Sequence, residues 1–164
     1  MTHVTPPADP GVASAQPPVA VRPGIVTAAG ITLIVLGILT MLLGLVLLIG
    51  AGLFAGAAGS IPETAEMPGV GGMFGAFAGA IFLITFIVIG FGVLQLVSGI
   101  NVLGGRGWAR VTGIVIAIIA GVIALAGIGA RDGAVISLAL VVANAFVVYA
   151  LATTGSWFVP RPRA

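Results

Sequence analysis

The sequence predicts an all-α fold, a four-span antiparallel bundle of transmembrane helices. Of 164 residues, 60% are hydrophobic and only 6% are charged, whereas a soluble domain is about 25% charged. The charged residues separate four long uncharged tracts, at 23–62, 67–105, 111–130 and 133–160. A helix crosses a bilayer with about 20 apolar residues, so every tract is long enough. This composition excludes a water-soluble globule, and it also excludes a disordered chain, which needs low hydrophobicity and high charge.

The first two tracts are long enough for two short spans each, but one span per tract fits their composition better. Leu, Ile and Val are dense at 31–53 and again at 77–103, where we expect the first two spans. The residues between these stretches are mainly Ala, Gly, Ser and Pro, so we expect an extracytoplasmic loop at 56–74. A six-span arrangement is the alternative. The third and fourth spans are expected at 111–128 and 134–151.

All ten prolines lie outside the expected spans, which supports these boundaries because proline breaks helices. We expect a disordered, Pro-rich cytoplasmic tail at 1–24, a four-helix membrane domain at 25–155 and a short basic cytoplasmic tail at 156–164. The first two helices are expected to project beyond the outer leaflet. In the loop, Ser60 and Glu63 have capping-box spacing and predict one helical turn. Asp132 is expected to be the N-cap of the fourth helix.

The distribution of arginines predicts the orientation. The two tails and the turn before the third span carry five arginines, whereas the opposite side carries only Arg131. Because positively charged residues stay on the cytoplasmic side, both termini should be cytoplasmic in a plasma membrane. The five arginines are Arg22, Arg106, Arg110, Arg161 and Arg163.

Two stretches carry a resemblance. Arg22-Pro-Gly-Ile-Val-Thr-Ala-Ala-Gly30 opens the first helix after the Pro-rich tail, and Leu103-Gly-Gly-Arg-Gly-Trp-Ala-Arg-Val111 opens the third. This arrangement resembles small four-helix membrane proteins of unknown function from actinobacteria, in which a Gly-Arg-x-Trp-Ala-Arg turn precedes the third span. The use of Arg without Lys would suit a high-GC genome. The resemblance implies an uncharacterised family with no activity, cofactor or catalytic residue to carry over.

Small residues on each span predict how the helices pack. Spans associate through close backbone approach, which small residues permit. Such residues recur two turns apart at Gly37 and Gly44 and at Gly92 and Gly99. On the third span, Gly113, Ala117 and Gly121 form one ridge, and on the fourth Ala139 and Ala143 do. The ridge on the third span is expected to be a helix-packing face, and the alternative is that it mediates a homodimer.

Polar residues inside the spans are few. Gln95, Ser98 and Asn101 form a stripe on one side of the second span, and Asn144 lies at about the depth of Gln95. We therefore expect an interhelical hydrogen bond between Gln95 and Asn144. The alternative is a polar vestibule in a pore or small-molecule pathway.

The sequence offers no candidate for catalysis. The single His is His3 in the tail, the one close carboxylate pair is Glu63 and Glu66, and there is no Cys. Two carboxylates fall short of a Ca²⁺ site, and no ionisable residue lies inside a span for a proton relay. We expect no catalytic, cofactor or metal site.

Arg106 and Arg110 flank Trp108 at the membrane surface, where we expect them to fix the topology. The alternative is that these three residues bind anionic lipid headgroups. The expected partners are the lipid bilayer and either a second copy of the chain or another membrane protein. Nucleic acid is not expected as a partner, because the positive-inside rule already explains where the arginines lie. The function predicted is a non-enzymatic structural or interaction protein of the cell envelope. The alternative is a channel or small-molecule transporter component.

Overall fold

The computed structural model describes residues 22–60, 69–129 and 133–158. It contains four α-helices, α1 (Gly24–Gly59), α2 (Val70–Leu103), α3 (Gly107–Gly127) and α4 (Ala134–Thr153), followed by a short 3-10 helix, η1 (Gly155–Phe158). The described ranges contain no strand. All four α-helices are long and apolar enough to cross a membrane. The predicted all-α fold with four membrane-spanning helices is therefore confirmed, and the chain has the architecture of a multi-pass membrane protein.

The first two helices are longer than the spans expected from hydropathy. α1 has 36 residues and α2 has 34, so each is about 50 Å long at 1.5 Å per residue. Residues 56–59 and 70–74, which we expected in the loop, are helical. Hydropathy reports which residues favour lipid and does not by itself mark where a helix ends, and here the two helices continue together through Gly-containing sequence at both positions. Near this end the rings of Phe54 and Phe74 lie 5.9 Å apart and connect the two helices.

The ends of the helices test two expectations about capping. The Ser60 hydroxyl donates to the carbonyl of Ala57 at 2.7 Å and so closes α1. The helical turn expected after Ser60, with Glu63 as its capping partner, lies outside the described residues. Asp132 also lies outside them, and the N-cap of α4 is Gly133.

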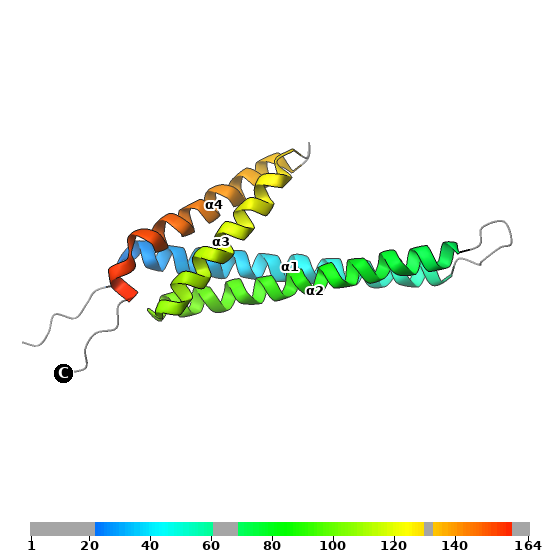
Figure 1. Ribbon diagram of the computed structural model, residues 1–164, viewed down its shortest axis with the longest axis horizontal. Helices are drawn as coiled ribbons and strands as arrows, with labels where there is room; N and C mark the ends of the chain where they lie inside the picture. The colour runs from blue at the N-terminus through cyan, green and yellow to red at the C-terminus, as the bar shows by residue number, and fades with distance from the viewer. Residues whose placement is uncertain (1–21, 61–68, 130–132, 159–164) are drawn as a thin grey trace, which may run out of the picture.

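The helices form two antiparallel hairpins (Figure 1). The α1/α2 hairpin is long, and the α3/α4 hairpin is short. They meet at the end where α1 begins and α4 ends, and they diverge away from it. We call the meeting region the junction. The bundle is therefore closed at the junction and open at its other end.

Two heptad series of small residues hold α1 against α2. Gly30, Gly37, Gly44 and Ala51 are buried on α1, and Ala78, Thr85, Gly92 and Gly99 are buried on α2. A Cβ atom added at Gly37 would lie 2.8 Å from the backbone nitrogen of Leu96 and 2.9 Å from the carbonyl oxygen of Gly92. The backbones therefore touch over several turns. A seven-residue repeat keeps such a contact in register along two supercoiled helices, and the expected role of these glycines in packing is confirmed.

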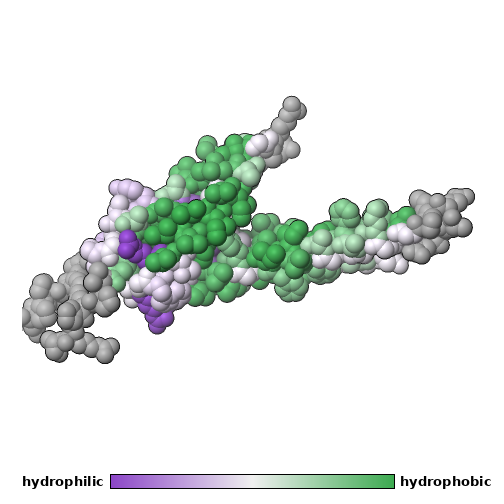
Figure 2. Space-filling view, viewed as in Figure 1, coloured by the Kyte–Doolittle hydropathy of each residue, from purple (hydrophilic) through white to green (hydrophobic). Residues whose placement is uncertain are grey.

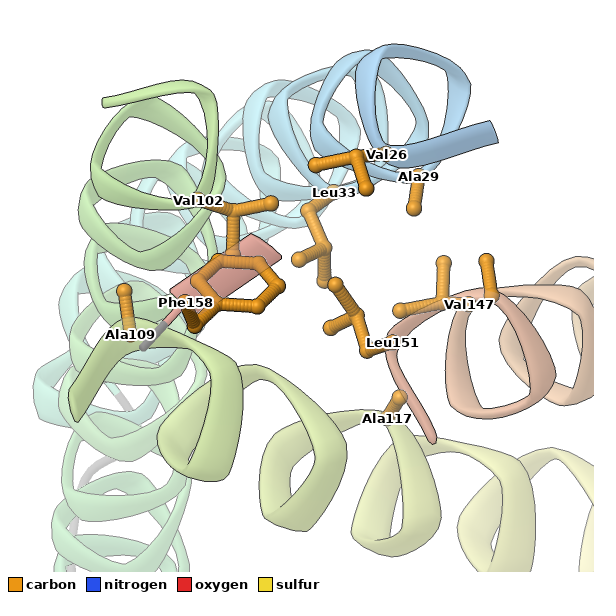
Figure 3. Packing of buried hydrophobic residues seen from close by; sticks show 10 residues of the cluster. Val26, Ala29, Leu33, Val102, Ala109, Ala117, Val147, Leu151 and Phe158 are labelled. Atoms are coloured by element: carbon orange, nitrogen blue, oxygen red, sulfur yellow. The ribbon is translucent and has the colours of Figure 1, made fainter. Parts of the chain in front are cut away.

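The hydrophobic core lies at the junction and joins the two hairpins (Figure 3). Leu33 of α1 and Leu151 of α4 point toward each other there and are fully buried. Gly113 of α3 makes room for both, because an added Cβ would lie 3.0 Å from Cδ1 of Leu151 and 3.3 Å from Cδ1 of Leu33. The complete cluster contains Val26, Ala29, Leu33, Val102, Ala109, Ala117, Val147, Ala150, Leu151 and Phe158.

In the view of Figure 2, the surface away from the junction is strongly apolar on the short hairpin and on the middle of the long hairpin, and it is paler toward the outer end of the long hairpin. Large side chains such as Leu53 and Val135 are 72% and 82% exposed. The charged residues within the described ranges are Arg22, Arg106 and Arg110, and all three are at the junction end. An apolar surface with arginines at one end is what a lipid-facing protein presents.

Candidate functional site

The polar residues buried between the helices are the candidate functional site, because polar side chains are few in the apolar helices and the buried ones are withdrawn from the lipid-facing surface. Four polar side chains are buried, at 0 to 3% exposure. They are Thr85, Gln95, Ser98 and Asn144. The contacts of each decide whether they form one site or serve separate helix contacts.

Gln95 is bound within the α1/α2 hairpin. Its Oε1 atom accepts a hydrogen bond of 3.1 Å from the hydroxyl of Thr40. The same hydroxyl donates to the carbonyl of Leu36 at 2.8 Å, so its single proton is shared between two acceptors. The Cβ of Gln95 lies 3.2 Å from where a Cβ at Gly37 would stand. A glycine on α1 therefore makes room for the amide on α2, and the hydrogen bond aligns the two helices.

The expected stripe of Gln95, Ser98 and Asn101 does not form a continuous polar surface. Ser98 is buried, and its hydroxyl has no partner among the described residues. Asn101 is half-buried, and its Nδ2 donates to the carbonyl of Val97 at 2.7 Å. Its Oδ1 accepts a hydrogen bond of 2.6 Å from Arg106. Asn101 therefore holds the turn between α2 and α3 rather than extending a polar path.

Asn144 lies in the other hairpin. Its Nδ2 donates to the carbonyl of Leu140 at 2.8 Å, and its buried Oδ1 has no partner within the described part of the chain. The residue faces α3, where an added Cβ at Gly121 would lie 3.6 Å from its own Cβ. The expected hydrogen bond between Gln95 and Asn144 is therefore not formed. Residue counting places the two at the same depth, but Gln95 faces α1 and Asn144 faces α3.

A shallow groove of about 370 Å³ runs beside Asn144 between α3 and α4. Its lining comes from these two helices alone and is almost entirely apolar. Gln95, Ser98 and Asn101 take no part in it. The groove is open at the surface and its lining is apolar, so it does not correspond to the polar vestibule of the alternative expectation. It is lined by Ala117, Ile118, Gly121, Val122, Leu125, Val141, Asn144, Ala145, Val148 and Tyr149.

The small-residue ridge on α3 packs inside the chain. Gly113 contacts the core, Ala117 is 1% exposed, and Gly121 faces Asn144 of α4. The ridge is thus a helix-packing face, as one of our two expectations had it. A homodimer through the same face would have to displace α4.

Arg110 has a role that its sequence context did not indicate. Its Nε donates to the carbonyl of Leu151 at 2.8 Å, and its Nη2 donates to the carbonyl of Ala152 at 3.1 Å. These are among the last carbonyls of α4, which lack helical partners and carry the negative end of the helix dipole. Gly155 leaves space for the guanidinium, since an added Cβ would lie 3.0 Å from it. Arg110 and Leu151 are 41 residues apart in the sequence, so no local sequence motif could have predicted this contact.

Arg106 and Trp108 remain at the surface. Both are exposed, Trp108 at 50%. They can reach lipid headgroups at the junction end, whereas Arg110 is committed to α4. The single histidine and the carboxylate pair of the sequence, His3, Glu63 and Glu66, lie outside the described residues. The described residues contain no group of three His, Cys, Asp or Glu side chains that could hold a metal ion.

Comparison of the chain with models of protein families, with curated proteins and with solved structures finds no significant match.

Proposed function

We propose that this chain is a non-enzymatic structural or interaction protein of a bacterial plasma membrane, with both termini in the cytoplasm. The proposal retains the resemblance to uncharacterised four-helix membrane proteins of actinobacteria. Its partners are the bilayer itself, anionic headgroups near Arg106 and Trp108, and a further membrane protein or a second copy.

One observation carries the proposal: the polar side chains in the middle of the helices act one by one in helix contacts. Thr40 and Gln95 connect α1 to α2, Asn101 holds the α2–α3 turn, and Asn144 packs against α3. A pathway for a polar solute needs polar groups that follow one another along a water-accessible surface. Here they lie at separate contacts in different hairpins, which favours a structural role over a channel or small-molecule transporter component.

A flux assay separates the two functions. The full chain, reconstituted in liposomes, should release trapped ions or small neutral solutes no faster than protein-free liposomes. The matched variant is Gln95→Leu, which removes the central amide of the stripe. Flux that exceeds the protein-free rate and falls in Gln95→Leu would establish a transport pathway and overturn the structural proposal.

Reporter fusions test the orientation. A green fluorescent protein at either terminus should fluoresce, and alkaline phosphatase at either terminus should be inactive, because phosphatase folds only outside the cytoplasm. A phosphatase inserted in the loop between α1 and α2 is the control and should be active. Active phosphatase at the C-terminus would overturn the proposed threading.

A further inference from the structure

The two hairpins differ in apolar length. In α1 the uncharged, largely apolar stretch runs from Ile25 to Phe54, and in α2 it runs from Phe74 to Leu103. Each stretch is about 45 Å long at 1.5 Å per residue. α3 and α4 have 21 and 20 residues, about 30 Å, which is the thickness of a hydrocarbon core. One bilayer cannot match both hairpins if they stand parallel.

The contacts between the hairpins are concentrated at the junction. Beyond Gly37 the buried residues of α1 are Gly44 and Ala51, and both belong to the contact with α2. On α2, the buried residues before Gln95 are likewise Ala78, Thr85 and Gly92 of the same contact. The outer half of the long hairpin therefore packs only on itself, and the two hairpins diverge there (Figure 1).

Only one short segment links the hairpins covalently. It consists of residues 104–106, between the end of α2 and the start of α3. Gly105 lies there at a φ of +71°, in the left-handed region that glycine adopts without strain. Within the described residues, the junction core and this turn join the two hairpins, and the helices of each hairpin run unbroken away from them; we call the core and the turn together the pivot and each hairpin an arm.

We propose that lipid acyl chains fill the wedge between the two hairpins and that the angle between the hairpins follows the thickness of the bilayer. In a 30 Å hydrocarbon core, a 45 Å stretch fits at a tilt of about 48°, beyond the upper end of the 0–40° range of transmembrane helices. A 30 Å stretch fits upright. The short hairpin therefore stands near the membrane normal and the long one leans away from it. In this proposal the tilt replaces the projection beyond the outer leaflet that we expected from the sequence. The apolar surface of the short arm and of the middle of the long arm (Figure 2) suits hydrocarbon as the occupant.

With the short hairpin held upright by its cytoplasmic end, the geometry gives the direction and size of the response. Thickening the hydrocarbon core from about 27 Å to about 33 Å lowers the tilt that matches 45 Å from about 53° to about 43°. The long hairpin then rises toward the short one, and the wedge narrows. Take one position on the long hairpin about 40 Å from the pivot and one on the short hairpin about 27 Å from it. The distance between these two positions falls by about 5 Å.

The chain contains no Cys, so pairs of nitroxide labels can be introduced without background. We would label the double variant Leu53→Cys and Val135→Cys, whose native side chains are 72% and 82% exposed on the two arms. Pulsed electron paramagnetic resonance would measure the distance in the full chain, reconstituted into phosphatidylcholine bilayers with monounsaturated chains of 16 to 22 carbons. We expect a shortening of about 5 Å from the thinnest to the thickest bilayer. The control pair, Leu53→Cys with Phe77→Cys within the long hairpin, should keep a constant distance.

A constant distance between the arms would overturn the proposal, since it would mean a rigid wedge. A distance between singly labelled Leu53→Cys chains that persists when lipid is added in large excess, found together with a constant distance between the arms, would overturn lipid as the occupant, because a second copy would then hold the wedge open. A pair nearer the pivot, Ile38→Cys with Ile118→Cys, should show a smaller change of the same sign. These outcomes are independent of the flux and fusion assays, so the proposed structural role and the thickness response can fail separately.

Discussion

Gly37→Ala is the substitution for which the structure makes the sharpest prediction. The new Cβ would stand 2.8 Å from the nitrogen of Leu96 and 2.9 Å from the carbonyl oxygen of Gly92, while ordinary contact begins at 3.4 Å. Both obstacles are backbone atoms, so no rotamer change can relieve them. α1 and α2 must separate locally by about 0.5 Å, and overpacking of this kind costs ~1–3 kcal/mol.

Gly50→Ala is the matched control. Gly50 lies in the same helix, and an added Cβ there meets nothing within 4 Å. Both substitutions gain the same helix propensity, up to ~1 kcal/mol, so the difference between them isolates the packing cost. The assay is unfolding in mixed micelles of increasing dodecyl sulfate fraction, followed by far-ultraviolet circular dichroism. Equal unfolding free energies for the two variants would refute the close backbone contact.

The remaining predictions concern single side chains. A double-mutant cycle of Thr40→Val and Gln95→Leu should give a coupling of about 0.6 kcal/mol, the average for hydrogen bonds between membrane helices, whereas the cycle of Gln95→Leu and Asn144→Leu should give none. Arg110→Gln should destabilise the protein by ~1–2 kcal/mol, because α4 loses charged donors to its terminal carbonyls at a partly exposed site; Arg106→Gln, at an exposed position, should cost less. Gly113→Val should lower stability by ~1–3 kcal/mol through overpacking of the junction core. Detergent unfolding measures all of these, and an Arg110→Gln protein as stable as Arg106→Gln would contradict the role assigned to Arg110.

The number of helices, their order and their approximate positions follow from the sequence. Charged residues and prolines are costly inside lipid, so they mark where helices cannot cross, and the density of Leu, Ile and Val in the first two tracts favoured one span in each. The helix contacts made by the glycine pairs at 37 and 44 and at 92 and 99 could also be predicted. Helices that associate without a hydrophobic driving force need small residues at regular spacing to bring their backbones together. The positions of the helices and of the glycine contacts each depend on single residues or on a local repeat, so both can be predicted from the sequence.

The neighbour that a buried polar side chain faces could not be predicted from the sequence. Counting residues put Gln95 and Asn144 at one depth, but helix packing turned the first toward Thr40 and the second toward Gly121. Similarly, the sequence around Arg110 indicates only a topology signal. In the structure the end of α4 lies beside Arg110, whose guanidinium binds the carbonyl groups of Leu151 and Ala152.

The sequence by itself determined that the chain has four helices long and apolar enough to cross a membrane, because the free energy of placing each residue in hydrocarbon is a nearly local quantity. Only the tertiary structure decided that the two hairpins are joined at one end and open at the other. That arrangement depends on which side of each helix meets which neighbour. Contacts between residues far apart in the chain, such as Leu33 with Leu151 at the junction, determine that choice, and no repeat in the sequence records them.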